Sequence, residues 1–80
     1  MTVEVRLQQL SMGMSEAEIV TWFVRDGDRV EIEDDLVEVE AEKVSIIVPA
    51  PVGGIVRNVN GAAGDVLQVR DLLCVIEADG

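Results

Sequence analysis

The fold is decided by residues 36–48, which read LVEVEAEKVSIIV. Small or apolar residues alternate with glutamate through the first half of this stretch, and the alternation resumes after Lys43. Alternation with a period of two is typical of a strand that buries one face. Only Glu42 and Lys43 separate the two runs, so the stretch predicts a tight β-hairpin with Lys43 at its tip.

Strand signals also surround this hairpin. Residues 3–7 alternate and predict a first strand, while residues 17–24 predict a second strand that ends at the turn signal Asp26-Gly27-Asp28. Residues 9–16 break the pattern with serine and glycine, so we expect a surface loop there. Fifteen Val and six Ile among 80 residues favour strands over helices. The sequence therefore predicts an all-β chain.

The sequence also contains an internal repeat with an offset of 37 positions. Six residues of the first unit recur unchanged in the second: Gly27, Asp28, Asp34, Leu36, Glu40 and Ala41 recur as Gly64, Asp65, Asp71, Leu73, Glu77 and Ala78. Two units are too few for a solenoid, so we expect two similar halves packed face to face, each burying the apolar sheet face of the other. This predicts a small sandwich or flattened barrel with internal two-fold pseudo-symmetry. The repeat aligns Lys43 with Gly80, so the duplication does not explain why a lysine stands at position 43.

Length and composition restrict the possible functions. We expect a single domain over residues 1–80, with no room for a second core or a large catalytic cleft. The chain has no His, which removes the usual general base and metal ligand. Its one cysteine, Cys74, excludes an internal disulfide and a thiolate zinc site. We therefore expect no catalytic residues and no metal ligands.

The charge and hydropathy of the chain restrict its partners. A formal net charge of −10 argues against nucleic acid and anionic membrane surfaces. No apolar run approaches the ~18 residues of a membrane-spanning helix. Glu4 and Arg6 interrupt the segment where a signal peptide needs an apolar stretch. We expect a cytoplasmic protein that is monomeric as an isolated domain, with the acidic residues between 34 and 42 forming a solvated face.

Lys43 is the candidate functional residue. Five of the six basic residues are Arg, so Lys43 is the only side-chain amine. A lysine amine can be deprotonated and acylated, whereas arginine holds its charge. At the tip of a hairpin this amine would stand away from the surface as an attachment point for a prosthetic arm. The alternative is a solvated lysine that only protects an exposed turn from aggregation.

Residues 42–56, EKVSIIVPAPVGGIV, resemble the attachment segment of lipoyl domains, the swinging-arm modules of 2-oxo acid and acetoin dehydrogenase complexes. Residues 19–30 and 64–77 resemble the second strand and turn and the closing half of the same family. The resemblance implies a flattened β-barrel of two four-stranded antiparallel sheets. It also implies lipoate in amide linkage to Lys43, with Glu42 and Val44 as the turn flanks that the modifying ligase recognises.

The resemblance implies a non-catalytic carrier that moves acyl groups and reducing equivalents between active sites. The implied partners are a lipoate–protein ligase, a thiamine-dependent decarboxylase, an acyltransferase core and dihydrolipoyl dehydrogenase. In this family the first loop lies near the lipoyl turn and contributes to the choice of partner. Two alternatives remain open. Biotin carriers share the architecture but typically flank the lysine with Met, where this chain has Glu42 and Val44. An unmodified lipoyl-like interaction module needs no lysine at the tip.

Overall fold

The computed structural model describes residues 1–10 and 12–79, and these residues form eight strands. Gly80, which the repeat places opposite Lys43, lies outside the described residues. Within the described part of the chain, no helix has the length and hydropathy to cross a membrane. The strands are β1 (Thr2–Arg6), β2 (Glu16–Trp22), β3 (Arg29–Val30), β4 (Asp35–Ala41), β5 (Val44–Pro49), β6 (Gly54–Arg57), β7 (Val66–Gln68) and β8 (Leu72–Ala78).

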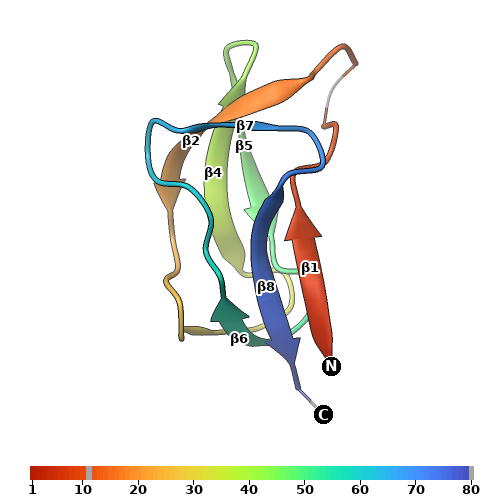
Figure 1. Cartoon of the computed structure of the whole chain (residues 1–80), viewed down its shortest axis with the longest axis vertical. Helices are drawn as coiled ribbons and strands as arrows, with labels where there is room; N and C mark the ends of the chain where they lie inside the picture. Colours follow the sequence, from red (N-terminus) through yellow and green to blue (C-terminus); the bar gives the residue numbers. More distant parts are fainter. Residues whose placement is uncertain (11, 80) are drawn as a thin grey trace.

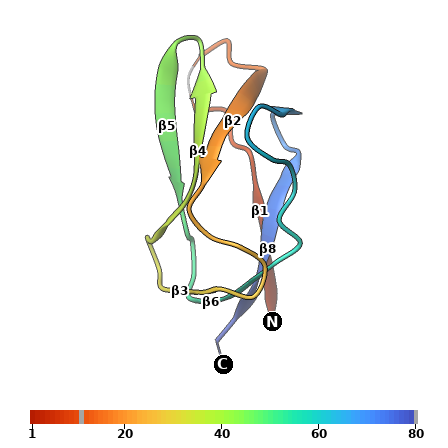
Figure 2. The ribbon, with the colours of Figure 1, turned by 90° about the vertical axis from the view of Figure 1, so that its left-hand side faces the viewer.

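The strands form two four-stranded sheets that pack face to face (Figure 1). One sheet has the order β1-β8-β6-β3 and the other has the order β5-β4-β2-β7. Every pairing is antiparallel. Figure 2 shows β5, β4 and β2 as one layer and β1 and β8 as the other. The predicted flattened sandwich of two four-stranded antiparallel sheets is therefore confirmed.

The two halves of the sequence exchange strands. Adding four to each strand number converts one sheet order into the other, which is the expected two-fold relation. The prediction that each half forms its own sheet is wrong, because β1 and β3 pair with β8 and β6 of the second half. The link between β2 and β3 crosses between the sheets, where the Gly27 N–H donates to the Val56 carbonyl at 2.7 Å. Its counterpart is the Gly64 N–H, which donates to the Ile19 carbonyl at 2.8 Å.

Aspartates close equivalent turns in the two halves. Oδ2 of Asp28 and of Asp65 each accept a hydrogen bond from the backbone N–H three residues earlier, at 2.8 and 2.9 Å. Asp34 and Asp71 repeat this bond, both at 2.9 Å. A short side chain that bonds to the nearby backbone explains why aspartate recurs in tight turns. The internal repeat is thus preserved at the level of single hydrogen bonds.

The hydrophobic core lies between the two sheets. Val39 on β4 and Ile76 on β8, equivalent in the repeat, are 1% and 0% exposed. β2 ends at Trp22, earlier than predicted, and Trp22 packs against the core while the next residue, Phe23, remains half-exposed. Cys74 is buried, and burial raises the pKa of its thiol to about 11. The buried side chains are Val5, Leu7, Met14, Ala17, Ile19, Val30, Leu36, Val37, Val39, Ala41, Ala50, Val56, Leu73, Cys74 and Ile76.

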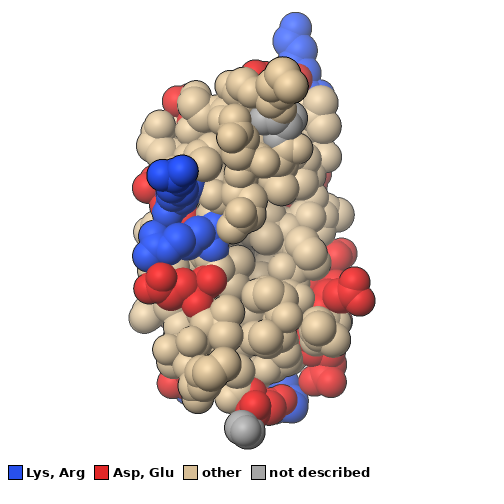
Figure 3. All heavy atoms as spheres, turned by 90° about the vertical axis from the view of Figure 1, so that its right-hand side faces the viewer, with Lys and Arg blue, Asp and Glu red and all other residues tan. Residues whose placement is uncertain are grey.

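β1 and β5 are outer strands of their sheets, and each pairs with a single neighbour among the described residues. Their side chains line a shared groove, so the two strands lie on the same side of the sandwich. Figure 3 looks onto the side where β1 lies and shows a band of uncharged surface along the length of the molecule, with charged groups on both flanks.

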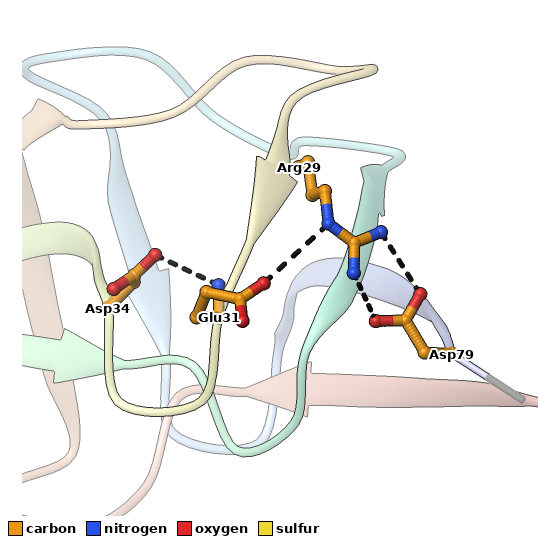
Figure 4. Close-up of polar contacts among 4 residues, drawn as sticks. All are labelled: Arg29, Glu31, Asp34 and Asp79. Carbon is orange, nitrogen blue, oxygen red and sulfur yellow. Dashed lines mark hydrogen bonds and ion pairs between the residues drawn. The ribbon is translucent and has the colours of Figure 1, made fainter.

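Both ends of the described chain lie at the end of the molecule opposite the β4–β5 hairpin (Figure 1). The Ala78 N–H donates to the Met1 carbonyl at 2.8 Å. In the internal repeat, this contact is equivalent to the pairing of Ala41 with Val44 beside the hairpin turn at the other end of the molecule. Arg29 on β3 binds both carboxylate oxygens of Asp79, which holds the end of the chain against the sheet (Figure 4).

Candidate functional site

Lys43 occupies the second position of the two-residue turn between β4 and β5. Ala41 and Val44 form the last pair of the strand ladder, as the hairpin prediction requires. The φ angles of Glu42 and Lys43 are +52° and +67°. Positive φ at both central positions is the pattern of a type I′ turn, whose twist matches that of the flanking strands. The predicted position of Lys43 at the hairpin tip is therefore confirmed.

The three predicted site residues are all exposed. Glu42 and Lys43 lie on the surface, and Val44 at the base of the turn is 57% exposed. Lys43 forms no ion pair with any described residue. The turn stands at one end of the longest axis of the molecule, along which the chain extends 37 Å. An unpaired amine at this place is accessible to a large modifying enzyme and fits an amide attachment.

The strand below the turn is firmly held. β4 lies between β2 and β5, so its backbone is hydrogen-bonded on both sides. Its inward side chains Val37, Val39 and Ala41 are buried almost to the turn. A short, well-paired turn on such a base limits the conformations of Glu42 and Lys43. The structure therefore fixes the backbone of the site and leaves the lysine side chain free to extend.

The first loop lies beside this turn, as the family resemblance implied. A Cβ built on Gly13 would lie 3.9 Å from Oε1 of Glu42. Met14 is buried, and its Sδ accepts a hydrogen bond from the Leu10 N–H at 3.4 Å, which anchors the loop. A hollow of about 320 Å³ separates the loop from the end of β4. The sequence did not single out Gly13 as a neighbour of Glu42, because a contact between distant segments leaves no local pattern.

Charge is distributed unequally over the two sheets. Glu18 on β2 and Glu40 on β4 are directly opposite each other, an arrangement that destabilises a sheet through like-charge repulsion. Neither forms an ion pair with a described residue, whereas the ion pairs that are present involve Arg6, Arg29 and Arg57 of the other sheet. The described residues contain no group of three acidic or sulfur side chains arranged to hold a metal ion. The face beside the turn is thus a solvated acidic surface.

Comparison with known sequences identifies related proteins. A family model described as "Biotin-requiring enzyme" matches residues 3–79. The dihydrolipoyllysine-residue succinyltransferase component of the 2-oxoglutarate dehydrogenase complex from Bartonella vinsonii subsp. berkhoffii is 38% identical over 98% of this chain and 19% of that protein. The dihydrolipoyllysine-residue acetyltransferase component of the pyruvate dehydrogenase complex from Staphylococcus aureus (strain Mu50) is 41% identical over 98% of this chain and 18% of that protein. The chain thus spans about a fifth of the length of these relatives.

Comparison with solved structures shows the same fold. The solution structure of the lipoyl domain of the 2-oxoglutarate dehydrogenase complex from Azotobacter vinelandii matches with a TM-score of 0.81 and 20% identity, covering 98% of this chain and 99% of that one. The crystal structure of Kluyveromyces lactis urea carboxylase matches with a TM-score of 0.80 and 24% identity, covering 95% of this chain and 6% of that one.

Proposed function

This chain belongs to the biotin/lipoyl family, and we propose that it is a lipoyl carrier domain with lipoate in amide linkage to Nζ of Lys43. The observation that carries the proposal is the exposed, unpaired Lys43 at the second position of a type I′ turn. It is the only lysine of the chain. Bound there, lipoate supplies a dithiolane that accepts acyl groups and electrons.

Two observations favour lipoate over biotin. The relatives that align with 98% of the chain at 38–41% identity are dihydrolipoyllysine-residue acyltransferase components. The likeness to urea carboxylase, at 24% identity, concerns the fold alone. The flanks of the lysine are Glu42 and Val44, so a ligase that binds this turn meets an exposed carboxylate and a stiff β-branched side chain. Biotin remains the alternative outcome of the test below.

In this proposal the domain itself catalyses nothing and works by presenting Lys43. The ladder that ends at Ala41 and Val44 fixes the direction of the turn. The covalent tether raises the effective concentration of the attached group at each active site that the domain visits. Glu18 and Glu40 keep the face beside the turn acidic, which steers the domain toward basic surfaces and limits self-association.

We assign the domain to a 2-oxo acid dehydrogenase-type complex, because its relatives are components of the 2-oxoglutarate and pyruvate complexes. Its partners would be a lipoate–protein ligase, a thiamine-dependent decarboxylase, an acyltransferase core and dihydrolipoyl dehydrogenase. We place it in the cytoplasm. The sequence has a single cysteine and so no internal disulfide, which is usual for cytoplasmic proteins.

The test is modification of the whole chain by purified ligases, followed by intact mass and peptide mapping. Lipoate–protein ligase should add one lipoyl group, and mapping should place it on Lys43. Lys43→Arg should block the addition while shifting the free energy of unfolding by less than about 0.5 kcal/mol, because the side chain is exposed. A chain that takes biotin as readily as lipoate, or that leaves Lys43 bare, would contradict the proposal. A large loss of stability in Lys43→Arg would make the lysine structural.

A further inference from the structure

A groove of about 330 Å³ runs between the two outer strands β1 and β5, on the side of the molecule shown in Figure 3. We call it the β1–β5 groove. Its walls are largely apolar, and the side chains used in the argument below are Val3, Val5 and Leu10 on one wall and Ile47, Val48 and Pro49 on the other.

The apolar side chains at the rim of the groove are not needed by the core. Leu10 is 42% exposed and Ile47 is 47% exposed, although both are large aliphatic residues. On β5 it is Ile46 and Val48 that pack against the core, and Ile47 has the opposite orientation. Leu10 lies beyond the end of β1, in the first loop, and its side chain adds to the groove. A ligand with an apolar surface would bury both residues.

The backbone along β5 opposes filling of the groove by an added strand. The Ala50 N–H donates to the Asp34 carbonyl, and the Ala50 carbonyl accepts from the Glu33 N–H. Backbone groups of successive residues in a strand point to opposite edges, so those of Pro49, the residue before Ala50, face the free edge. Proline has no N–H to donate there. On the β1 side, the ion pair between Glu4 and Arg6 lies along the outer strand and charges its edge. An apolar group that needs no backbone hydrogen bonds fits this groove better than a strand does.

We infer that the β1–β5 groove is the resting site of the lipoyl arm, which would lie along β5 with its ring beside Ile47. This inference rests on the proposed function. Val44 is the first residue of β5, so the attachment turn leads directly into the strand that forms one wall of the groove. Ile47 is four residues beyond Lys43, about 13 Å along an extended strand. An arm of eleven bonds from Cα to the ring spans roughly 14 Å at about 1.25 Å of advance per bond.

The arm is a hydrocarbon chain with a disulfide ring, so its chemistry matches that of the groove. Moving it from water onto Ile47 and Leu10 removes apolar surface from solvent on both partners. Docking would keep the ring from solvent until a partner withdraws it.

The first experiment compares NMR spectra of three forms of the whole chain: unmodified, acetylated at Lys43 and lipoylated at Lys43. Acetylation removes the same charge but adds no arm, so it isolates the effect of charge loss. We expect shift changes confined to the turn in the acetyl form, and extending to the methyl groups of Val3, Leu10 and Ile47 in the lipoyl form. Changes confined to the turn in both forms would overturn the inference. Shift changes that grow with protein concentration would also overturn the inference, because they would show that a second copy of the chain occupies the groove.

The second experiment measures how fast a water-soluble phosphine reduces the lipoyl ring. Ile47→Ser should increase this rate about threefold if the arm is docked about two-thirds of the time. Ile32→Ser is the matched control, because Ile32 is exposed and lies in the turn between β3 and β4, outside the groove. Equal rates in the two variants would overturn the inference and leave the proposed function intact. Failure of Lys43 to accept lipoate would instead overturn the proposed function, and the inference with it.

Discussion

Val39 and Ile76 allow a direct test of the two-fold architecture, because the repeat makes them equivalent and both are fully buried. Val39→Ala removes two carbon atoms and Ile76→Ala removes three. At about 0.8 kcal/mol per buried carbon, the transfer contribution is about 1.6 and about 2.4 kcal/mol. The cavity left behind raises the expected losses to roughly 2–3 and 3–4 kcal/mol. Both are large against the roughly 4–12 kcal/mol that an 80-residue domain has in total.

The assay is urea denaturation followed by the fluorescence of Trp22, the only tryptophan, which packs against the core. The denaturation midpoint should fall in both variants while the slope stays constant. Ile76→Val, with an expected loss of about 1 kcal/mol, provides a measurement if the alanine variant does not fold. Glu40→Ala, on the outer face of β4, should change the stability by less than about 0.5 kcal/mol. A large loss at one core position and none at the other would refute the equivalence of the two halves.

Three further predictions concern the turn, the strand ladder and the buried thiol. Glu42→Met combined with Val44→Met should lower lipoylation and allow biotinylation without unfolding, because a biotin ligase that binds the turn no longer has to desolvate the Glu42 carboxylate. Intact mass after incubation with each ligase measures both modifications, and an unchanged preference for lipoate would contradict the prediction. Gly54→Ala should cost about 3 kcal/mol in urea denaturation, because the added methyl group would overlap the Glu77 carbonyl oxygen; near-wild-type stability would show that the strands can separate there. Burial raises the pKa of the Cys74 thiol to about 11, so the unfolded chain loses the thiol proton first, and stability should fall as the pH rises from about 9 to about 11, by roughly 3 kcal/mol at most. Cys74→Val should lack this part of the pH profile, and identical profiles would contradict the assignment.

The hairpin and its lysine could be predicted from the sequence because their signals are local. Alternation over residues 36–48 and a gap of two residues permit few arrangements other than a hairpin with Lys43 at the tip. The repeat was visible for the same reason, since the aspartates that close equivalent turns bond only to backbone three residues away. The family model and the relatives confirm the resemblance that these residues indicated.

The features that the sequence did not reveal depend on contacts between distant segments. The exchange of strands between the halves follows from bonds such as that of Gly27 to Val56, which join segments far apart in the chain. The burial of both Leu36 and Val37 contradicts simple alternation, because a bulge between Asp35 and Val37 shifts the register. A bulge leaves no period of its own in the sequence, so alternation alone assigns one of the two residues to solvent.

The hydrogen bond between Ala78 and Met1 has a consequence for the topology of the backbone. Since the ends of the described chain already pair as Ala41 and Val44 do, a short peptide linker between them would close the chain into a ring without moving either sheet. Closing a loop of about 80 residues removes unfolded-state entropy worth about 4–5 kcal/mol in the chain-entropy model. The ring would reverse direction at two opposite ends, the β4–β5 hairpin and the new linker, which the internal two-fold relates to each other. It could be cut at either end. Cutting it at Lys43 would give a circular permutant in which the attachment turn becomes the new pair of termini.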